Sequence, residues 1–143
     1  MVYVVDSSVY APLVALYGRN LIKAMKRVKI VILDLTVYES CNAFWKECKK
    51  LHRISDEEAI KACEACKALS KYVNVYKIID LDVRDIIEIA ISNNITFYDS
   101  SYIALAQKLK ASIVSEDKDI ISIAPKYGLE VIRLHEFLRI LQA

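Results

Sequence analysis

Glycine and proline are scarce in this chain, with two residues of each among 143. So few turn-forming residues argue against a flexible linker and favour helices joined by short connections. Although 55% of the residues are hydrophobic, no uninterrupted apolar run reaches the length of a membrane-spanning helix. The N-terminus has no basic segment and meets an acid at Asp6, so a signal peptide is not predicted. We therefore expect a cytoplasmic protein that does not enter a membrane.

The chain also lacks a strong charge of either sign. Its formal net charge is only +2, so the whole molecule offers little long-range attraction to nucleic acid. Any such binding would depend on local groups of basic residues. The two histidines, His52 and His135, have no serine or cysteine partners in the pattern of a nucleophilic triad.

The four cysteines lie in segments with helical patterns, at Cys41, Cys48, Cys63 and Cys66. Cys63 and Cys66 have a C-x-x-C spacing, but the surrounding EEAIKACEACKAL segment lacks the turn residues of a redox motif or a zinc knuckle. We favour small side chains that face the core. A disulfide between the two adjacent helices that carry the cysteines remains open.

Short apolar runs alternate with helical patterns along the whole chain. This alternation predicts an α/β fold of one domain over residues 1–143, with three layers (α/β/α) and a central parallel sheet of four to five strands. The right-handed crossover rule places the carboxyl ends of all the strands at one edge of the sheet. The expected strands are residues 2–5, 30–33, 75–79, 111–115 and an edge strand at 130–133.

The helical segments have apolar residues at three- and four-residue spacings. Ser55 and Glu58 form a capping box that marks the start of one helix. Pro12 is tolerable only in the first turn of the first helix. The expected helices are residues 9–16, 19–28, 36–53, 55–72, 82–91, 99–110, a short helix from 117, and 136–141.

Four acids stand where strand-like runs give way to helices, or just inside those helices: Asp6, Glu39, Asp99 and Asp117. Each alone is typical of a helix cap or a first-turn acid. Because parallel strands end at one edge, we expect the four carboxylates to converge there. Carboxylates at close range cannot all stay ionised without a cation, and oxygen ligands suit Mg²⁺ or Mn²⁺.

Four segments carry a family resemblance, in order along almost the whole chain: VVDSSV, ESCNAF, YDSSYIALA and IVSEDKDI. In these four segments the sequence resembles the PIN-domain nucleases, and most closely the VapC-type toxins of prokaryotic toxin–antitoxin pairs. The third segment is the most specific, because an Asp that opens a helix rich in Tyr, Ala and Leu is characteristic of that family.

By this resemblance, the family's catalytic, metal-binding acids correspond to Asp6, Glu39, Asp99 and Asp117. Asn42 and Ser115 match the family's Asn and its Ser or Thr, and together with Ser8 they are expected to hydrogen-bond carboxylates or metal-bound water. Asp119 matches an acid that only some members have, and it is a further candidate ligand.

The resemblance implies an endonuclease that cleaves single-stranded RNA with Mg²⁺ or Mn²⁺ and leaves a 5′-phosphate. RNA would need basic residues near the acids, or else these are ordinary solvated helix faces. The candidates are Arg19, Lys23, Lys26, Arg27, Lys46 and Lys49, with Lys50 and Arg53 beside them. Tyrosines that could stack on bases, or pack in a core, are Tyr10, Tyr17, Tyr38 and Tyr102.

The same resemblance implies two protein partners. VapC-type relatives form homodimers, and a cognate VapB-type antitoxin holds them inactive. The C-terminal segment of that antitoxin lies along the N-terminal helices of the toxin and can push a basic side chain into the acidic pocket.

Other functions stay open. The fold could serve a stand-alone PIN-fold RNA-processing nuclease, or a non-catalytic RNA- or protein-binding module in ribosome maturation or RNA quality control. The complete set of four acids favours a nuclease. A phosphatase with a D-x-D opening fits poorly, because Ser8 takes the place of its second acid. A receiver domain also fits poorly, with Lys118 as the only candidate for its lysine.

Overall fold

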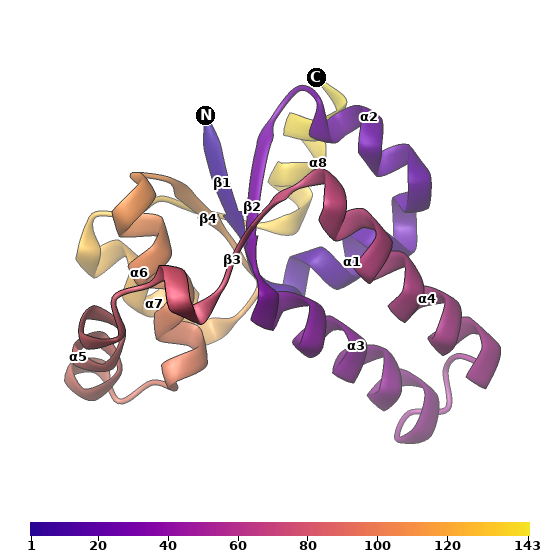
Figure 1. Cartoon of the computed structure of the whole chain (residues 1–143), viewed down its shortest axis with the longest axis horizontal. Helices are drawn as coiled ribbons and strands as arrows, with labels where there is room; N and C mark the ends of the chain where they lie inside the picture. The colour runs from indigo at the N-terminus through magenta and orange to yellow at the C-terminus, as the bar shows by residue number, and fades with distance from the viewer.

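The computed structural model describes residues 1–143 and has a parallel sheet between two layers of helices (Figure 1). The strands are β1 (Val2–Val5), β2 (Lys29–Leu33), β3 (Asn74–Tyr76), β4 (Ser112–Val114) and β5 (Val131–Ile132). The helices are α1 (Ser7–Tyr17), α2 (Leu21–Met25), α3 (Asp34–Lys49), α4 (Asp56–Leu69), α5 (Val83–Asn93), α6 (Phe97–Leu109), α7 (Lys118–Ile123) and α8 (Leu134–Gln142). Four 3-10 turns complete it: η1 (Gly18–Asn20), η2 (Ser70–Tyr72), η3 (Ile78–Asp80) and η4 (Ala124–Tyr127). The predicted three-layer α/β/α fold is confirmed.

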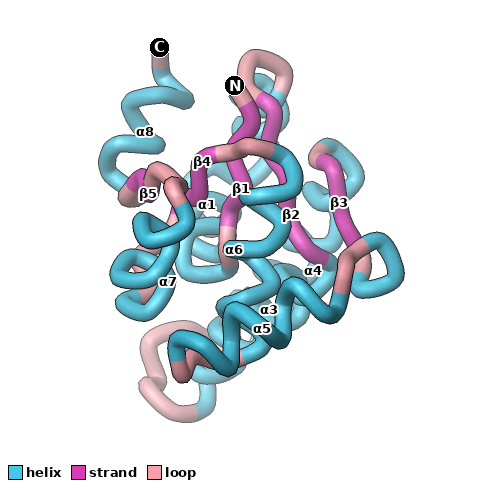
Figure 2. Tube along the Cα trace, turned by 90° about the vertical axis from the view of Figure 1, so that its left-hand side faces the viewer, coloured by secondary structure: helices cyan, strands magenta, loops and turns pink.

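The strands follow the order β3–β2–β1–β4–β5, and every neighbouring pair is parallel. Figure 2 shows them side by side, from β5 on the left to β3 on the right. The chain adds β2 and β3 on one side of β1, and then β4 and β5 on the other. The order therefore reverses between β1 and β4. In open α/β sheets, ligands bind at such a reversal, outside the carboxyl ends of the strands.

Alternate strand residues supply two separate cores, because successive side chains of a strand point to opposite faces of the sheet. Tyr3 and Val5 of β1 face the layer formed by α1–α4 and α8, where the Tyr3 and Phe137 rings meet edge to face at 5.2 Å. Val4 faces the other layer, where α6 contributes the fully buried Ile103. Since both faces of the sheet are covered, the ends of the strands are where polar groups can meet a ligand.

Several helix starts agree with their sequence signals. Ser55 Oγ accepts a hydrogen bond from the Glu58 N–H at 3.1 Å, and Glu58 Oε1 accepts one from the Ser55 N–H at 3.0 Å, so the predicted capping box is formed. Asp82 Oδ1 accepts from the Arg84 N–H at 3.0 Å and caps α5, which starts where a helix is predicted. These local hydrogen bonds satisfy backbone groups that a helix start leaves free.

The expected start of the first helix and the expected end of the third strand were both wrong. Helix α1 begins at Ser7, two residues earlier than expected, so Pro12 stands inside the helix rather than in its first turn. The buried side chains of Val9 and Leu13 on either side hold that part of α1 against the sheet. Strand β3 ends at Tyr76 instead of residue 79, because the chain turns into η3 and leaves Ile79 85% exposed.

Two expected elements divide or shift. The helix expected at residues 19–28 is the 3-10 turn η1 followed by the short helix α2, which ends at Met25. The apolar residues before Asp99 form no strand. Instead Thr96 caps α6, and its Oγ1 accepts from the Asp99 N–H at 3.0 Å, which places Asp99 in the first turn.

The four cysteines are free thiols, so the disulfide left open above is not formed. Cys48 and Cys66 are buried as expected, whereas Cys41 and Cys63 are half-buried. Across the α3–α4 interface, Cys41 Sγ lies 4.0 Å from the carbonyl oxygen of Cys63, and Cys63 Sγ lies 3.8 Å from that of Cys41. No helix combines the length and the apolar character needed to cross a membrane.

Candidate active site

The sheet brings the acidic residues to the carboxyl edge, at the reversal between β1 and β4. Asp6 directly follows β1, and Asp117 lies three residues beyond β4. The backbone N–H of Asp6 donates to the carbonyl of Val114 at 3.2 Å, which extends the pairing of the two strands past their ends. Glu39 lies on α3, which follows β2, and Asp99 lies at the start of α6.

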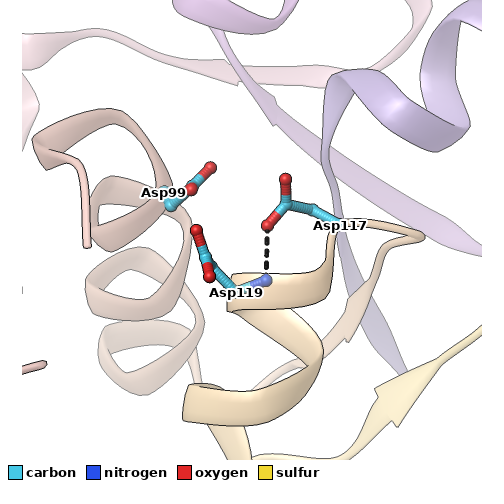
Figure 3. Close-up of side chains that lie close together, drawn as sticks. All are labelled: Asp99, Asp117 and Asp119. Carbon is cyan, nitrogen blue, oxygen red and sulfur yellow. Dashed lines mark hydrogen bonds between the residues drawn. The ribbon is translucent and has the colours of Figure 1, made fainter. Parts of the chain in front are cut away.

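Three aspartates form the tightest part of this site, which we call the aspartate triplet: Asp99, Asp117 and Asp119. One carboxylate oxygen from each lies within 4.8 Å of the others. Figure 3 shows their side chains converging from the first turn of α6 and from the start of α7. Asp99 and Asp117 are half-buried, and Asp119 is exposed. Asp6 and Glu39 stand outside this tight group.

Asp117 both caps α7 and contributes to the triplet. Its Oδ1 accepts hydrogen bonds from the backbone N–H groups of Asp119 at 2.9 Å and Ile120 at 3.1 Å. These two N–H groups belong to the free donors at the start of the helix, whose dipole also favours a negative charge. Its other oxygen accepts no hydrogen bond in the structure and remains available to a ligand.

Asp6 occupies the N-cap position of α1, but its side chain makes no cap hydrogen bond. Instead, Ser8 Oγ donates to Oδ1 at 2.6 Å and Ser115 Oγ donates to Oδ2 at 2.6 Å. Each serine hydroxyl in turn accepts a backbone N–H, from Glu116 at 2.9 Å and from Asp117 at 2.9 Å. Both serines therefore act as donors to Asp6. One of them follows β1 and the other follows β4, so the carboxylate is fixed from both strands.

Burial makes the ionised form of these acids costly. The pKa of Asp6 rises from 3.8 to about 7, mainly because the carboxyl group is buried; the hydrogen bonds from Ser115 and Ser8 oppose this rise, and the negative charges of Asp117 and Glu39 add to it. The pKa of Asp99 rises to about 6, mainly by burial and then through the charge of Asp117. No basic side chain offsets these charges, because the five ion pairs of the structure all involve other acids.

Glu39 is held by hydroxyl groups from two other helices. Tyr102 of α6 donates its hydroxyl to Glu39 Oε1 at 2.8 Å, and Ser7 Oγ donates to the same oxygen at 3.3 Å. Burial and the charge of Glu39 raise the pKa of the Tyr102 hydroxyl far above its ordinary value, so it remains a donor.

A family model described as the PIN domain matches residues 3–126. The chain belongs to the PIN domain family. Exonuclease VapC9 of Pyrobaculum aerophilum is 31% identical over 121 residues, which cover 84% of each chain. Ribonuclease VapC3 of the same organism is 27% identical over 88 residues, or 62% of this chain and 66% of that protein. The recognition of a VapC-type PIN nuclease from the sequence is therefore confirmed.

Solved structures agree on the fold. PAE2754 from Pyrobaculum aerophilum is 28% identical, with a TM-score of 0.76 over 98% of this chain and 88% of that one. VapBC2 from Rickettsia felis has a TM-score of 0.64 at 13% identity, over 93% of this chain and 98% of that one, and shows the PIN fold alone.

The chemistry of the donors fits a divalent metal ion, which PIN nucleases generally use. The aspartate triplet offers only carboxylate oxygens, which suit hard cations such as Mg²⁺, Mn²⁺ and Ca²⁺. None of the four cysteines belongs to this group, so the donor set does not favour zinc or copper. The raised pKa values of Asp6 and Asp99 show that their ionised forms are unfavourable at this buried, acidic position, and a bound cation would stabilise them.

The structure does not bring every predicted PIN-site residue to the acids. Ser8 and Ser115 contact Asp6, whereas Asn42 is exposed and makes no side-chain hydrogen bond. Tyr10 and Tyr102 are each 1% exposed, so the idea that they stack on bases was wrong. Tyr38 is 75% exposed and remains open to a base.

Most of the predicted RNA-binding residues lie far from the acids or are already engaged. Helix α1 begins at Ser7, directly after Asp6, and its length carries the chain about 16 Å before it reaches Arg19 and then Lys23. The guanidinium of Arg27 donates to the carbonyls of Ala143 at 3.0 Å and Leu141 at 2.7 Å, where it caps the end of α8. Lys49 pairs with Asp56 at 3.2 Å, whereas Arg19, Lys23, Lys26 and Lys46 form no ion pair.

We predict that the metal-free protein loses stability as pH rises through the titration of Asp6. Its pKa is higher in the folded state than the ordinary 3.8, so between about pH 4 and about pH 7 the native state holds more protons than the unfolded state. The free energy of unfolding then falls with rising pH. In a chelating buffer, the melting temperature should fall from about pH 4 to about pH 7, and Asp6→Asn should flatten this slope.

The exposed Asp85 on α5 provides a matched control, since Asp85→Asn removes a charge that lies outside the acidic site. The Asp85→Asn protein should keep the wild-type slope in the same calorimetric series. If Asp6→Asn also kept that slope, the burial of an unpaired charge at this position would be refuted.

Proposed function

We propose that this VapC-type PIN nuclease is a cytoplasmic, Mg²⁺- or Mn²⁺-dependent endoribonuclease that cleaves single-stranded RNA. The observation that carries the proposal is the aspartate triplet, whose oxygens lie within 4.8 Å of one another with no basic partner. In the proposed site, Asp99 and Asp117 are the main ligands, Asp119 and Glu39 are further ligands, and Asp6 completes the group of acids.

The site residues have separate tasks in hydrolysis of a phosphodiester. A divalent ion bound there would act as a Lewis acid on the phosphate and lower the pKa of a bound water. The Asp117 oxygen that does not cap α7 is free to bind the ion, and the two serines keep Asp6 in one orientation. The exposed Lys46 and Lys23 of α2, neither of which forms an ion pair, are candidates for contacts with RNA phosphates away from the cut.

Substitution of single site aspartates by asparagine provides the test of this activity. Asp117→Asn keeps an oxygen that can cap α7, whereas an alanine there would lose the cap at a cost of roughly 1 kcal/mol. Cleavage of a mixed single-stranded RNA pool with Mn²⁺ should fall more than about 100-fold in Asp99→Asn and Asp117→Asn, because loss of a residue that merely supports a ligand costs about 10- to 100-fold. The melting temperatures of the metal-free variants should not drop.

The Asp85→Asn protein, purified in the same way, should cleave at the wild-type rate. Equal cleavage by all these proteins would mean a contaminating nuclease and would remove the proposed mechanism. A circular RNA separates the two modes of attack, because it has no ends. An endonuclease opens the circle, whereas an exonuclease, the activity named for the relative VapC9, leaves it intact.

We further propose that the chain is the toxin of a VapBC-type pair and binds its antitoxin between α1, α3 and α4. A cavity of about 670 Å³ lies there, and its walls include Ser7 and Ser8 beside Asp6. A second cavity of about 640 Å³ reaches Arg19 and shares Ala65 of α4 as a lining residue. The two cavities form one groove, and alanines of α1, α3 and α4 make up part of its lining, so a helix or extended segment could approach the backbone closely there. Its end at Ser7 would bring a basic side chain of the partner to the acids.

A bulky residue in the groove should separate toxicity from neutralisation. Expression of the wild-type protein in a bacterial host should arrest growth, and Asp99→Asn should relieve the arrest. Ala15→Trp would fill the groove and should keep the arrest while co-expression of the product of an adjacent antitoxin gene no longer rescues growth. Leu16→Trp is the matched control, because Leu16 is 67% exposed and does not line the groove.

Rescue of Ala15→Trp by the antitoxin would place the docking surface elsewhere. No arrest by the wild-type protein would favour the second candidate, a stand-alone RNA-processing nuclease. The two outcomes are read from the same growth curves.

We also propose a homodimer through α5. Val83, Ile87 and Ile91 are spaced four residues apart on one face of this helix and are 49%, 39% and 75% exposed, and Ile79 precedes them at 85%. Water contact over such a stripe is unfavourable, and exposed apolar patches of this kind mark protein contacts.

Sedimentation velocity at micromolar concentration tests this surface. We expect a dimer for the wild type and a monomer for Val83→Lys combined with Ile91→Lys, because each lysine would bury an unpaired charge in the interface. Ile60→Lys should remain a dimer, since Ile60 is similarly exposed, at 59%, but belongs to α4. A dimer of the double variant would exclude the α5 stripe as the interface.

A further inference from the structure

Tyr102 connects Glu39 to the end of β2 through a chain of buried hydroxyl groups. The Tyr102 hydroxyl lies 2.8 Å from Glu39 Oε1 and 2.9 Å from Thr36 Oγ1. Thr36 Oγ1 accepts a hydrogen bond from the backbone N–H of Leu33, the last residue of β2, at 3.1 Å. Tyr102 is 1% exposed and Thr36 is fully buried, so water does not replace these contacts.

The Glu39 carboxylate determines which group is the donor in each hydrogen bond of this hydroxyl network. An ionised Glu39 can only accept, so the single proton of the Tyr102 hydroxyl points to Glu39. The contact between Tyr102 and Thr36 must then use the proton of Thr36. Thr36 accepts in its turn from the Leu33 N–H, which cannot rotate. A fixed backbone group therefore orients two hydroxyls in sequence, and the last of them orients Glu39.

This arrangement restrains one oxygen of Glu39 and leaves the other free. The hydrogen bonds from Tyr102 and Ser7 both end on Oε1, and Oε2 accepts none. A glutamate on a helix would otherwise lose side-chain entropy when it binds a cation, at the expense of affinity. With Oε1 already held by two donors, part of that loss is incurred when the protein folds.

We propose that Tyr102 is a positioning residue, which fixes the free oxygen of Glu39 for the divalent ion of the acidic site. The inference rests on the proposed metal-dependent function, and it assigns to Tyr102 a task beyond packing. Supporting partners of this type orient a ligand without touching the metal, and their loss weakens metal affinity.

The chain offers a close control for ordinary packing. Tyr10 is also 1% exposed, and its hydroxyl donates to the carbonyl of Cys66 at 2.9 Å, remote from the acids. Both Tyr10→Phe and Tyr102→Phe remove one oxygen and one buried hydrogen bond and keep the ring. A purely structural role predicts the same result for both.

Titration calorimetry with Mn²⁺ alone, on metal-free protein, provides the test. We expect Tyr102→Phe to weaken Mn²⁺ binding roughly tenfold and Tyr10→Phe to leave it unchanged, with similar falls in melting temperature for the two. Thr36→Val should weaken binding as well, and Thr36→Ser, which keeps the hydroxyl, should restore it. In cleavage of RNA, the Mn²⁺ concentration for half-maximal rate should rise in Tyr102→Phe, with most of the rate recovered at saturation.

The outcomes separate this inference from the proposed function. Wild-type affinity in Tyr102→Phe, together with lost affinity in Glu39→Gln, would overturn the role of Tyr102 and keep the metal site. Equal Mn²⁺ affinity in the wild type, Asp99→Asn and Glu39→Gln would overturn the metal site itself. Equal weakening in Tyr10→Phe and Tyr102→Phe would reduce Tyr102 to a packing residue.

Discussion

Carboxylates that are partly buried side by side, with no basic partner, dominate the energetics of this structure. Five acids gather at the carboxyl edge of the sheet: Asp6, Glu39, Asp99, Asp117 and Asp119. No lysine or arginine pairs with any of them, and the pKa values of Asp6 and Asp99 rise, first because these acids are buried and then because other carboxylates lie near them. A fold selected for stability alone would disperse these charges. Their convergence is understandable as a site prepared for a cation, at the expense of stability in its absence.

Hydroxyl groups and backbone N–H groups hold the acids in place of basic side chains. Asp6 accepts hydrogen bonds from Ser8 and Ser115, and Glu39 accepts one from Tyr102. Asp117 accepts hydrogen bonds from backbone N–H groups at the start of α7. Such neutral donors fix the position of a carboxylate without neutralising its charge, whereas a lysine would occupy the place of the metal. The same reasoning explains how an antitoxin segment would inhibit the enzyme, because one inserted basic side chain would supply the missing charge.

The sequence was sufficient for the parallel sheet and for the meeting of distant acids, because strand alternation and the crossover rule determine where strands end. It was not sufficient for the composition of the tightest group, which includes Asp119 and leaves out Asp6 and Glu39. That distinction depends on side-chain directions in the turns after β1 and β4. The role of Tyr102 was also missed, since its partner Glu39 lies 63 residues away and no local pattern links them. Thr96 as the cap of α6, three residues before Asp99, was the one signal that could have been read locally.

Anomalous X-ray diffraction from crystals soaked in Mn²⁺ would show whether the aspartate triplet binds a divalent ion. We expect an anomalous peak within coordination distance of the Asp99 and Asp117 carboxylates, next to Asp119. Manganese bound only elsewhere on the molecule, with these side chains well ordered and free of metal, would contradict it.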